Sequence, residues 1–181
     1  MKKRVLSLAL ALALLLSLVS GLQFSALGAG SYSKATSISV GETVILVCSD
    51  ASMELSSIST TNTKYGVGTA YTTSPGGLML LEVCEGSSAG TYAFKNGDKY
   101  LYWGSGNTLN ANATLSANTS WEVSFDTEGN ATILNSADPG RQILWNVGSP
   151  RFAAYTDKTV GNSYYNVQLY KAPTGSCWRS P

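Results

Sequence analysis

The chain has 181 residues, of which 44% are hydrophobic and 13% charged, and its 12 Lys and Arg against 11 Asp and Glu give a net charge of +1 at pH 7. It contains no histidine, which excludes a Ser-His-Asp or Cys-His catalytic arrangement and removes the commonest zinc ligand. Outside residues 2–4 the basic residues of this nearly neutral chain are isolated. They do not form the positive surface that binds phosphate backbones, so we expect no nucleic-acid partner.

The N-terminus has the pattern of a secretory signal peptide. Residues 2–4 are basic, residues 5–19 form an apolar run, and small residues follow at 26–30. Because the apolar run is shorter than the ~20 residues that span a bilayer, we predict a cleaved signal over 1–29, with a retained anchor as the alternative. Cleavage removes three of the 12 basic residues and leaves nine against 11 acidic ones, a net charge of −2. We therefore expect an exported protein with no membrane contact after cleavage.

The rest of the sequence predicts strands and turns and contains no helical pattern. Residues 43–48 form a continuous apolar run, as expected of a buried strand, and residues 121–125 alternate between apolar and polar side chains. Further strands are expected at 38–40, 53–57, 78–84, 91–95, 99–103, 141–146, 151–155 and 166–171, with turn-rich segments at 58–66, 72–77 and 104–120 and a hairpin turn at 126–130. We predict one all-β domain over 30–171, followed by an irregular tail over 172–181.

One pattern occurs twice, at an offset of 40 residues. Residues 81–94 align without a gap with 121–134, and the similarity continues into 99–103 and 141–145. A fainter third copy over 44–55 lies 48 residues before 92–103, which belongs to the first of these two copies. Three copies of a four-strand unit, each of about 40–48 residues, predict a β-trefoil-like barrel. One strand near the C-terminus exceeds the expected twelve, so another β-barrel or a β-sandwich is the alternative.

The repeat also sorts apolar residues into a predicted core. Trp103 and Trp145 occupy matching positions, as do Phe94 and Leu134. A large apolar residue that recurs between copies usually packs in the interior. We assign these pairs, together with Trp121, to the core.

Two stretches resemble known families. Residues 121–135, WEVSFDTEGNATILN, resemble the rhythm of Trp, Gly and Asn in the repeats of ricin-type β-trefoil lectins. Residues 149–156, SPRFAAYT, followed by VQLYK at 167–171, resemble an uncharacterised β-rich module that recurs near the C-terminus of large secreted bacterial proteins, some of them nucleases and other hydrolases. This second resemblance covers about residues 36–171 and implies an accessory, non-catalytic role.

The resemblance to ricin-type lectins predicts which residues bind a ligand. In ricin-type repeats an aspartate in the third strand accepts hydrogen bonds from sugar hydroxyls, and the matching positions here are Glu54, Tyr102 and Leu144. Only Glu54 has the acceptor. Aromatic side chains also stack on sugar rings, and Tyr100, Tyr102 and Tyr155 are candidates for such a platform. The hypothesised ligand residues are therefore Glu54, Tyr100, Tyr102 and Tyr155, although tyrosines on a solvated strand face are also ordinary.

No group of residues predicts catalysis, a metal site or a cofactor. Glu82 and Glu122 lie at matching positions of two copies, but each occupies the solvated side of an alternating strand. The acidic residues of the turn at 126–130 lack the spacing of an EF-hand and are explained by turn chemistry. We expect a protein that is not an enzyme.

Three cysteines leave one unpaired in an exported chain. Cys48 and Cys84 both close predicted strands and are the expected disulfide pair, whereas Cys177 lies in the tail. Three reduced thiols are the alternative.

These features favour a secreted, non-catalytic module whose partner is an extracellular glycan or cell-wall polymer. The alternative is a structural or protein–protein interaction domain, possibly a fragment of a larger secreted enzyme. The sequence favours no particular oligomeric state.

Overall fold

The strands of this protein are short, antiparallel and connected mainly by turns. A computed structural model describes residues 31–156 and 163–173; the predicted signal peptide, Cys177 and most of the predicted tail lie outside them. Within the described ranges, helix is confined to two 3₁₀ turns, η1 (Ser49–Ala51) and η2 (Ala117–Thr119). No helix in this part of the chain has the length and apolarity needed to cross a membrane. The all-β prediction is confirmed.

The fold is built from strands of two to six residues. In chain order they are β1 (Ser33–Lys34), β2 (Thr43–Cys48), β3 (Met53–Ile58), β4 (Gly66–Ala70), β5 (Leu81–Glu85), β6 (Tyr92–Asn96), β7 (Lys99–Tyr102), β8 (Asn110–Asn112), β9 (Trp121–Phe125), β10 (Ala131–Asn135), β11 (Gln142–Asn146), β12 (Arg151–Tyr155), β13 (Tyr164–Tyr165) and β14 (Gln168–Lys171).

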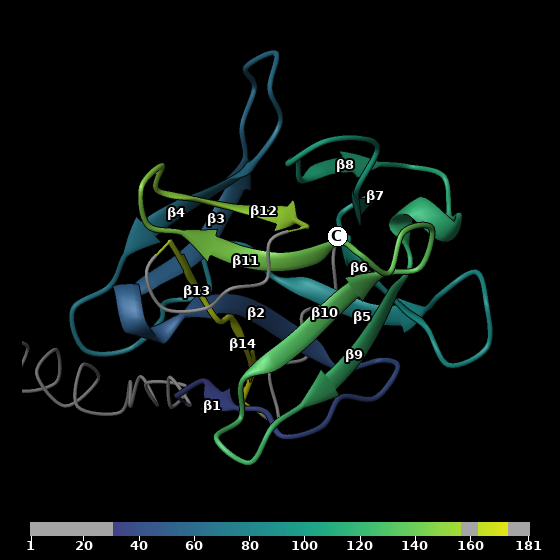
Figure 1. The fold of residues 1–181 in the computed structure, drawn as a ribbon. Helices are drawn as coiled ribbons and strands as arrows, with labels where there is room; N and C mark the ends of the chain where they lie inside the picture. The colour runs from purple at the N-terminus through teal and green to yellow at the C-terminus, as the bar shows by residue number, and fades with distance from the viewer. Residues whose placement is uncertain (1–30, 157–162, 174–181) are drawn as a thin grey trace, which may run out of the picture.

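Six of these strands pair edge to edge in a closed circuit (Figure 1). β2 pairs with β5, β5 with β6, β6 with β9 and β9 with β10, and β14 pairs back with β2. β10 reaches β14 through an isolated bridge between Ala131 and Val167, where the Ala131 N–H donates to the Val167 carbonyl at 2.8 Å. Such a circuit protects strand edges from pairing with other chains.

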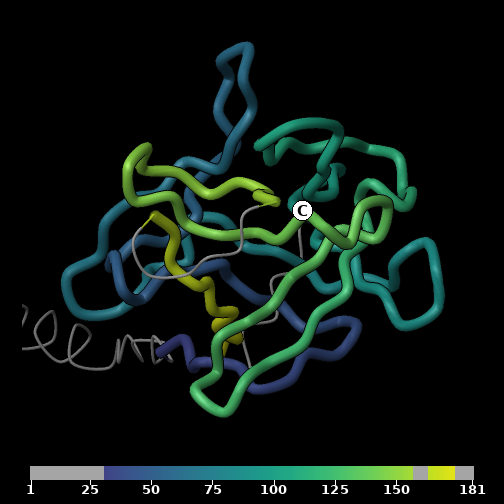
Figure 2. The backbone as a smooth tube through the Cα atoms, in the orientation of Figure 1, coloured from purple at the N-terminus to yellow at the C-terminus, as the bar shows by residue number. Residues whose placement is uncertain are grey.

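Three hairpins, β3–β4, β7–β8 and β11–β12, lie beside this circuit and join one another. Gly66 of β4 lies opposite Phe152 of β12. Two backbone hydrogen bonds of 3.1 Å also join the hairpins: the Leu109 N–H donates to the Lys64 carbonyl in the β3–β4 connection, and the Ala154 N–H donates to the Thr108 carbonyl before β8. A Cβ on Gly66 would lie 2.6 Å from Leu55 Cδ1 and 2.9 Å from Phe152 Cβ. Only glycine permits the hairpins to approach this closely. Figure 2 shows the β3–β4 connection projecting beyond the three hairpins.

The core lies inside the circuit and beneath the hairpins. Trp121 and Trp145 are buried as predicted, and Trp145 packs edge-to-face on Phe152 with 4.8 Å between ring centroids. Trp103 is half-buried and packs against the edge of the core. The main inward-facing residues are Val44, Leu46, Leu55, Leu81, Val83, Phe94, Leu101, Trp121, Ile133, Ile143, Trp145, Phe152, Val167 and Leu169.

The assignment of Leu134 to the core was wrong by one residue. Val83 lies opposite Phe94 in one hairpin, whereas Val123 lies opposite Ile133 in the other, because the β9–β10 connection is one residue shorter than the β5–β6 connection. A shift of one residue exchanges the two faces of a strand. Ile133 is therefore fully buried, and Leu134 is half-buried outside the core cluster.

The predicted disulfide was also wrong, because Cys48 and Cys84 are both free thiols. β2 and β5 are antiparallel with Thr43 opposite Glu82, so Cys84 lies level with position 41. Cys48 is seven residues further along β2, which corresponds to roughly 23 Å at ~3.3 Å per residue. A disulfide needs Cα atoms only about 4–7 Å apart.

Candidate functional site

Glu54, the predicted sugar acceptor, is engaged inside the protein. Its side chain is 2% exposed, and Oε2 accepts hydrogen bonds from the backbone N–H groups of Gly76 at 2.8 Å and Gly77 at 3.1 Å. Gly77 has φ +77°, and the Tyr32 hydroxyl lies where a Cβ on Gly77 would be. Glu54 therefore holds the connection between β4 and β5 against β3 and is not presented to solvent.

Tyr155 is also internal. It is 1% exposed, and its ring lies 4.6 Å from that of Tyr164. Its hydroxyl accepts a hydrogen bond from Arg151 Nε at 3.3 Å, while the Arg151 guanidinium lies 5.5 Å from the centroid of the Tyr65 ring. These contacts exclude Tyr155 from a surface platform and correct its prediction.

The structure separates the two remaining candidates, which lie on the same strand. Tyr100 and Tyr102 are both half-buried and alternate onto one face of β7, opposite Asn112 and Asn110 respectively. Tyr100 lines a groove on the surface. Tyr102 does not line it; the Tyr102 ring instead packs over Gly104, where a Cβ would lie 2.7 Å from the tyrosine hydroxyl.

The groove has a volume of about 360 Å³, within the usual range for small-ligand sites. Four chain segments form it: the end of β3, the residues before β5, the β6–β7 turn, and parts of β7 and β8. The lining residues are Ser56, Ser57, Ile58, Leu78, Met79, Asn96, Gly97, Asp98, Lys99, Tyr100, Leu101 and Ala111.

The β6–β7 turn presents charged groups at this groove. Asn96 lies opposite Lys99, and Gly97 adopts φ +60°, as a two-residue hairpin turn requires. The Asn96 side-chain amide donates to the Leu80 carbonyl at 2.8 Å, which ties the turn to the segment before β5. Within the described ranges, Asp98, the Lys99 ammonium and the Tyr100 hydroxyl form no side-chain hydrogen bond or ion pair, so they are available to a ligand.

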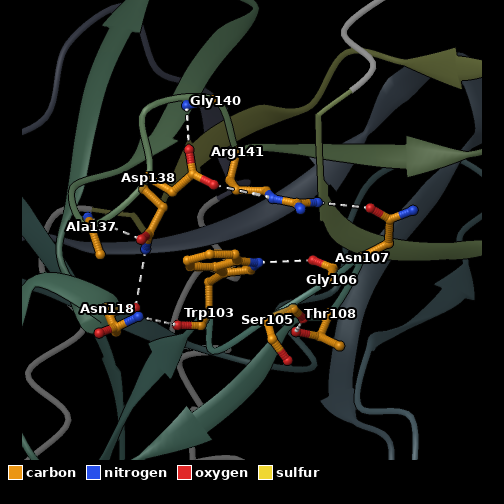
Figure 3. A network of polar contacts seen from close by, with 11 residues as sticks. Trp103, Ser105, Gly106, Asn107, Thr108, Asn118, Ala137, Asp138, Gly140 and Arg141 are labelled. Carbon is orange, nitrogen blue, oxygen red and sulfur yellow. Dashed lines mark hydrogen bonds and ion pairs between the residues drawn. The ribbon is translucent and has the colours of Figure 1, made fainter.

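A second aromatic centre, Trp103, is occupied by internal contacts (Figure 3). The indole Nε1–H donates to the Gly106 carbonyl at 2.9 Å, and the Arg141 guanidinium lies 5.3 Å from the ring centroid. Arg141 also donates to Asn107 at 2.9 Å and pairs with Asp138 at 3.5 Å. This network orders the connections around Trp103 and leaves its indole N–H engaged.

A second surface depression and the turn at 126–130 offer fewer groups to a ligand. A depression of about 300 Å³ contains Glu122, Ser124 and Thr132 but no aromatic residue among those that line it. Asp126 accepts backbone hydrogen bonds at 2.9 and 2.8 Å from residues 128 and 130, and one from the Asn130 side chain at 2.8 Å, which confirms the turn interpretation. In the parts of the chain that the structure describes, no three His, Cys, Asp or Glu residues gather as a metal site.

Sequence reasoning found Tyr100 but missed its neighbours. Asp98 and Lys99 follow an Asn-Gly pair, which is a strong hairpin-turn signal. Leu78 follows a glycine pair in a segment that was assigned to a turn and a strand. The turn signals could have located the charged tip, but no local pattern indicates that it meets Leu78.

No family model matches this chain. Nor does any curated protein sequence. Among solved structures, similarity of fold extends to a GH43 β-1,3-galactosidase at 14% identity and TM-score 0.57, and to a Polyporus squamosus lectin bound to a human-type influenza-binding epitope at 16% and 0.57. The BEL beta-trefoil is similar at 14% identity and TM-score 0.54.

The three likenesses differ in how much of each protein they include. They cover 78%, 75% and 73% of this chain, and 29%, 50% and 95% of the galactosidase, lectin and BEL chains respectively. The chain therefore spans less than two thirds of the first two structures. At these identities the likeness shows the fold alone, and it places this all-β chain beside β-trefoil structures.

Proposed function

We propose that this protein is a secreted, non-catalytic module that binds an extracellular glycan or cell-wall polymer in the groove lined by Tyr100. The observation that carries the proposal is the meeting of Tyr100 with two charged side chains that have no partner among the described residues, Asp98 and Lys99. An aromatic ring offers a flat apolar face to a sugar ring, and flanking charged groups fix the orientation of its hydroxyls.

The proposed fold behind this function is a three-unit β-trefoil barrel. The units are β2–β5, β6–β9 and β10–β14, each with two strands in the closed circuit and one hairpin beside it. The contacts among the three hairpins at Gly66, Leu109 and Phe152 support this arrangement, since these residues are spaced 43 positions apart. The groove then lies between the hairpins of the first two units.

Secretion and the accessory role rest on the sequence. The basic and apolar pattern of residues 1–29 supports export. The absence of histidine from the whole chain removes the commonest general base and so supports a non-catalytic role. The proposal includes no cofactor.

A polysaccharide pull-down, followed by calorimetry on the polymer that binds, tests the proposal. Tyr100→Ala should weaken binding by about tenfold or more, since the ring that would stack on the sugar and the hydroxyl that would hydrogen-bond to it are both removed. Tyr102→Ala is the matched control, because this tyrosine shares the strand and its face but lies outside the groove. Denaturation curves of both variants separate binding from folding. Failure to bind any polysaccharide, or equal losses in the two variants, would count against the groove.

The second candidate is a spacer or protein–protein interaction domain of a larger secreted protein. The partial coverage of the galactosidase favours it, because there a similar fold forms 29% of a longer chain. A catalytic domain encoded in the same reading frame would support this candidate, and the polysaccharide assay distinguishes it from glycan binding.

A further inference from the structure

The two walls of the groove differ in chemistry. One wall contains Leu78, Met79 and Ile58, and Leu78 is 55% exposed, the most exposed large apolar side chain of the described residues. A second wall is formed by the β6–β7 turn with Asp98 and by Lys99, which begins β7. An apolar side chain presented to water at the edge of a polar groove favours a ligand with a small apolar group next to polar ones.

We propose that this groove selects sugars that carry an N-acetyl group, so that its ligand is a glycan containing N-acetylhexosamine units. The inference rests on the proposed glycan-binding function and names the substrate class of the same site. An acetamido group combines a methyl group, an N–H donor and a carbonyl acceptor. The methyl group is suited to the Leu78 wall, the N–H to the Asp98 carboxylate and the carbonyl to the Lys99 ammonium.

An unsubstituted hexose fits this pair of walls less well. It carries a hydroxyl where the acetamido group would be, and that hydroxyl gains nothing from the Leu78 side chain. Burial of the methyl group alone corresponds to about a fourfold gain in affinity. A charge-assisted hydrogen bond from the amide raises the expected preference to about tenfold or more.

Both walls are held in place before a ligand arrives. The Asn96 amide bonds to the Leu80 carbonyl at 2.8 Å and joins the two walls. Glu54 fixes the Gly76–Gly77 turn immediately before Leu78 through bonds of 2.8 and 3.1 Å. A preformed groove loses little conformational freedom on binding, so the additional contacts of an acetamido group contribute directly to affinity.

Calorimetry or ligand-observed NMR on two matched pairs tests the inference: chitotriose (N-acetylated) against cellotriose, and N-acetylgalactosamine against galactose. The acetylated member of at least one pair should bind about tenfold more tightly. Leu78→Ser should reduce that preference below about threefold while leaving the affinity for the unsubstituted sugar unchanged. Val40→Ser is the control, because Val40 is 53% exposed and lies outside the groove, and it should change neither affinity.

The outcomes separate this inference from the proposed function. Equal or tighter binding of the unsubstituted sugars overturns the N-acetyl selectivity and leaves glycan binding intact. A Leu78→Ser variant that folds and keeps the full preference overturns the role of the apolar wall. If no polysaccharide and neither member of either pair binds, the proposed function itself fails.

Discussion

Replacing Glu54 with alanine should destabilise the protein by about 3 kcal/mol. The Glu54 carboxylate is 2% exposed and accepts two backbone hydrogen bonds, from Gly76 and Gly77. A hydrogen bond to a charged group contributes about 1.5–3 kcal/mol. Gly76 is exposed and Gly77 is half-buried, so water partly replaces the lost acceptor and each bond falls at the lower end. The sum is about 3 kcal/mol, or roughly 6–12 °C in Tm for a chain of this size.

Glu54→Gln is a sharp control, because both hydrogen bonds reach the same carboxylate oxygen, Oε2. A glutamine carbonyl can accept both bonds from that position. Neutral acceptors form bonds about half as strong as charged ones, so the expected loss is about 1.5 kcal/mol. Guanidinium unfolding measures both variants through the fluorescence of the buried Trp121 and Trp145. An unchanged denaturant slope establishes that the native and denatured states remain comparable.

The competing role of Glu54, as the acceptor for a sugar, predicts the opposite pattern. Alanine would then abolish glycan binding while leaving the free energy of unfolding within about 0.5 kcal/mol of the original, as is usual for a surface change. If Glu54→Ala unfolds at the same denaturant concentration as the parent, the assignment of Glu54 as an internal acceptor is refuted.

Two further predictions concern titratable groups. Cys48 is buried, and desolvation raises the pKa of its thiol to about 11. In the native protein Cys48 should therefore react with iodoacetamide at about pH 8 at least tenfold more slowly than the half-buried Cys84. A disulfide-linked peptide containing both cysteines would contradict the fold. The side chain and backbone of Asn130 hydrogen-bond Asp126 and hold the pKa of that carboxyl below its ordinary 3.8. Because the folded pKa is the lower one, this stabilisation is present above about pH 4 and is lost as the pH falls through the folded pKa. Asp126→Asn should therefore flatten the loss of stability as the pH falls below about 4, and equal slopes in the two proteins would exclude the contribution.

Strands with strong apolar patterns were predicted to the residue, and strands without them were missed. β2 and β12 have the predicted bounds, because both are continuous apolar runs buried on two faces. β4 is Gly-Val-Gly-Thr-Ala and was not predicted as a strand, since glycine is depleted in strands. Its glycines are needed because the Leu55 and Trp145 side chains lie close to the β4 backbone. This requirement comes from residues distant in the sequence, so no local pattern in β4 indicates it. The strand expected at 38–40 is absent, although Ile38 is buried.

The repeat located the hairpins but misplaced residues within them. An offset of 40 aligns β5 with β9, yet a connection shorter by one residue changes the offset to 39 for β6 and β10. An ungapped alignment does not detect this deletion at the core position, because it pairs Phe94 with Leu134, and Leu134 is apolar like its neighbour Ile133. Only the hydrogen-bond register shows which of the two faces the core.

Three residues that the alignment matches between copies lie on the first strand of each hairpin, and their packing explains why Glu54 is not a ligand residue. Glu54, Tyr102 and Leu144 are the residues that the lectin resemblance matched to the sugar-binding aspartate, and only Glu54 has the acceptor. In the structure each is packed in its own way: Glu54 binds the N–H groups of a glycine turn, Tyr102 covers Gly104, and Leu144 joins a buried cluster with Tyr155.

These differences reflect the chain that lies over each hairpin. A carboxylate is stable at this buried position only where a neighbouring connection offers N–H donors, as residues 76 and 77 do for Glu54. That same connection continues into Leu78 and forms one wall of the groove. The acceptor that a sequence comparison assigns to a sugar thus serves to position the wall, and in the proposed function the glycan is contacted by Tyr100 of β7 and by Asp98 of the β6–β7 turn.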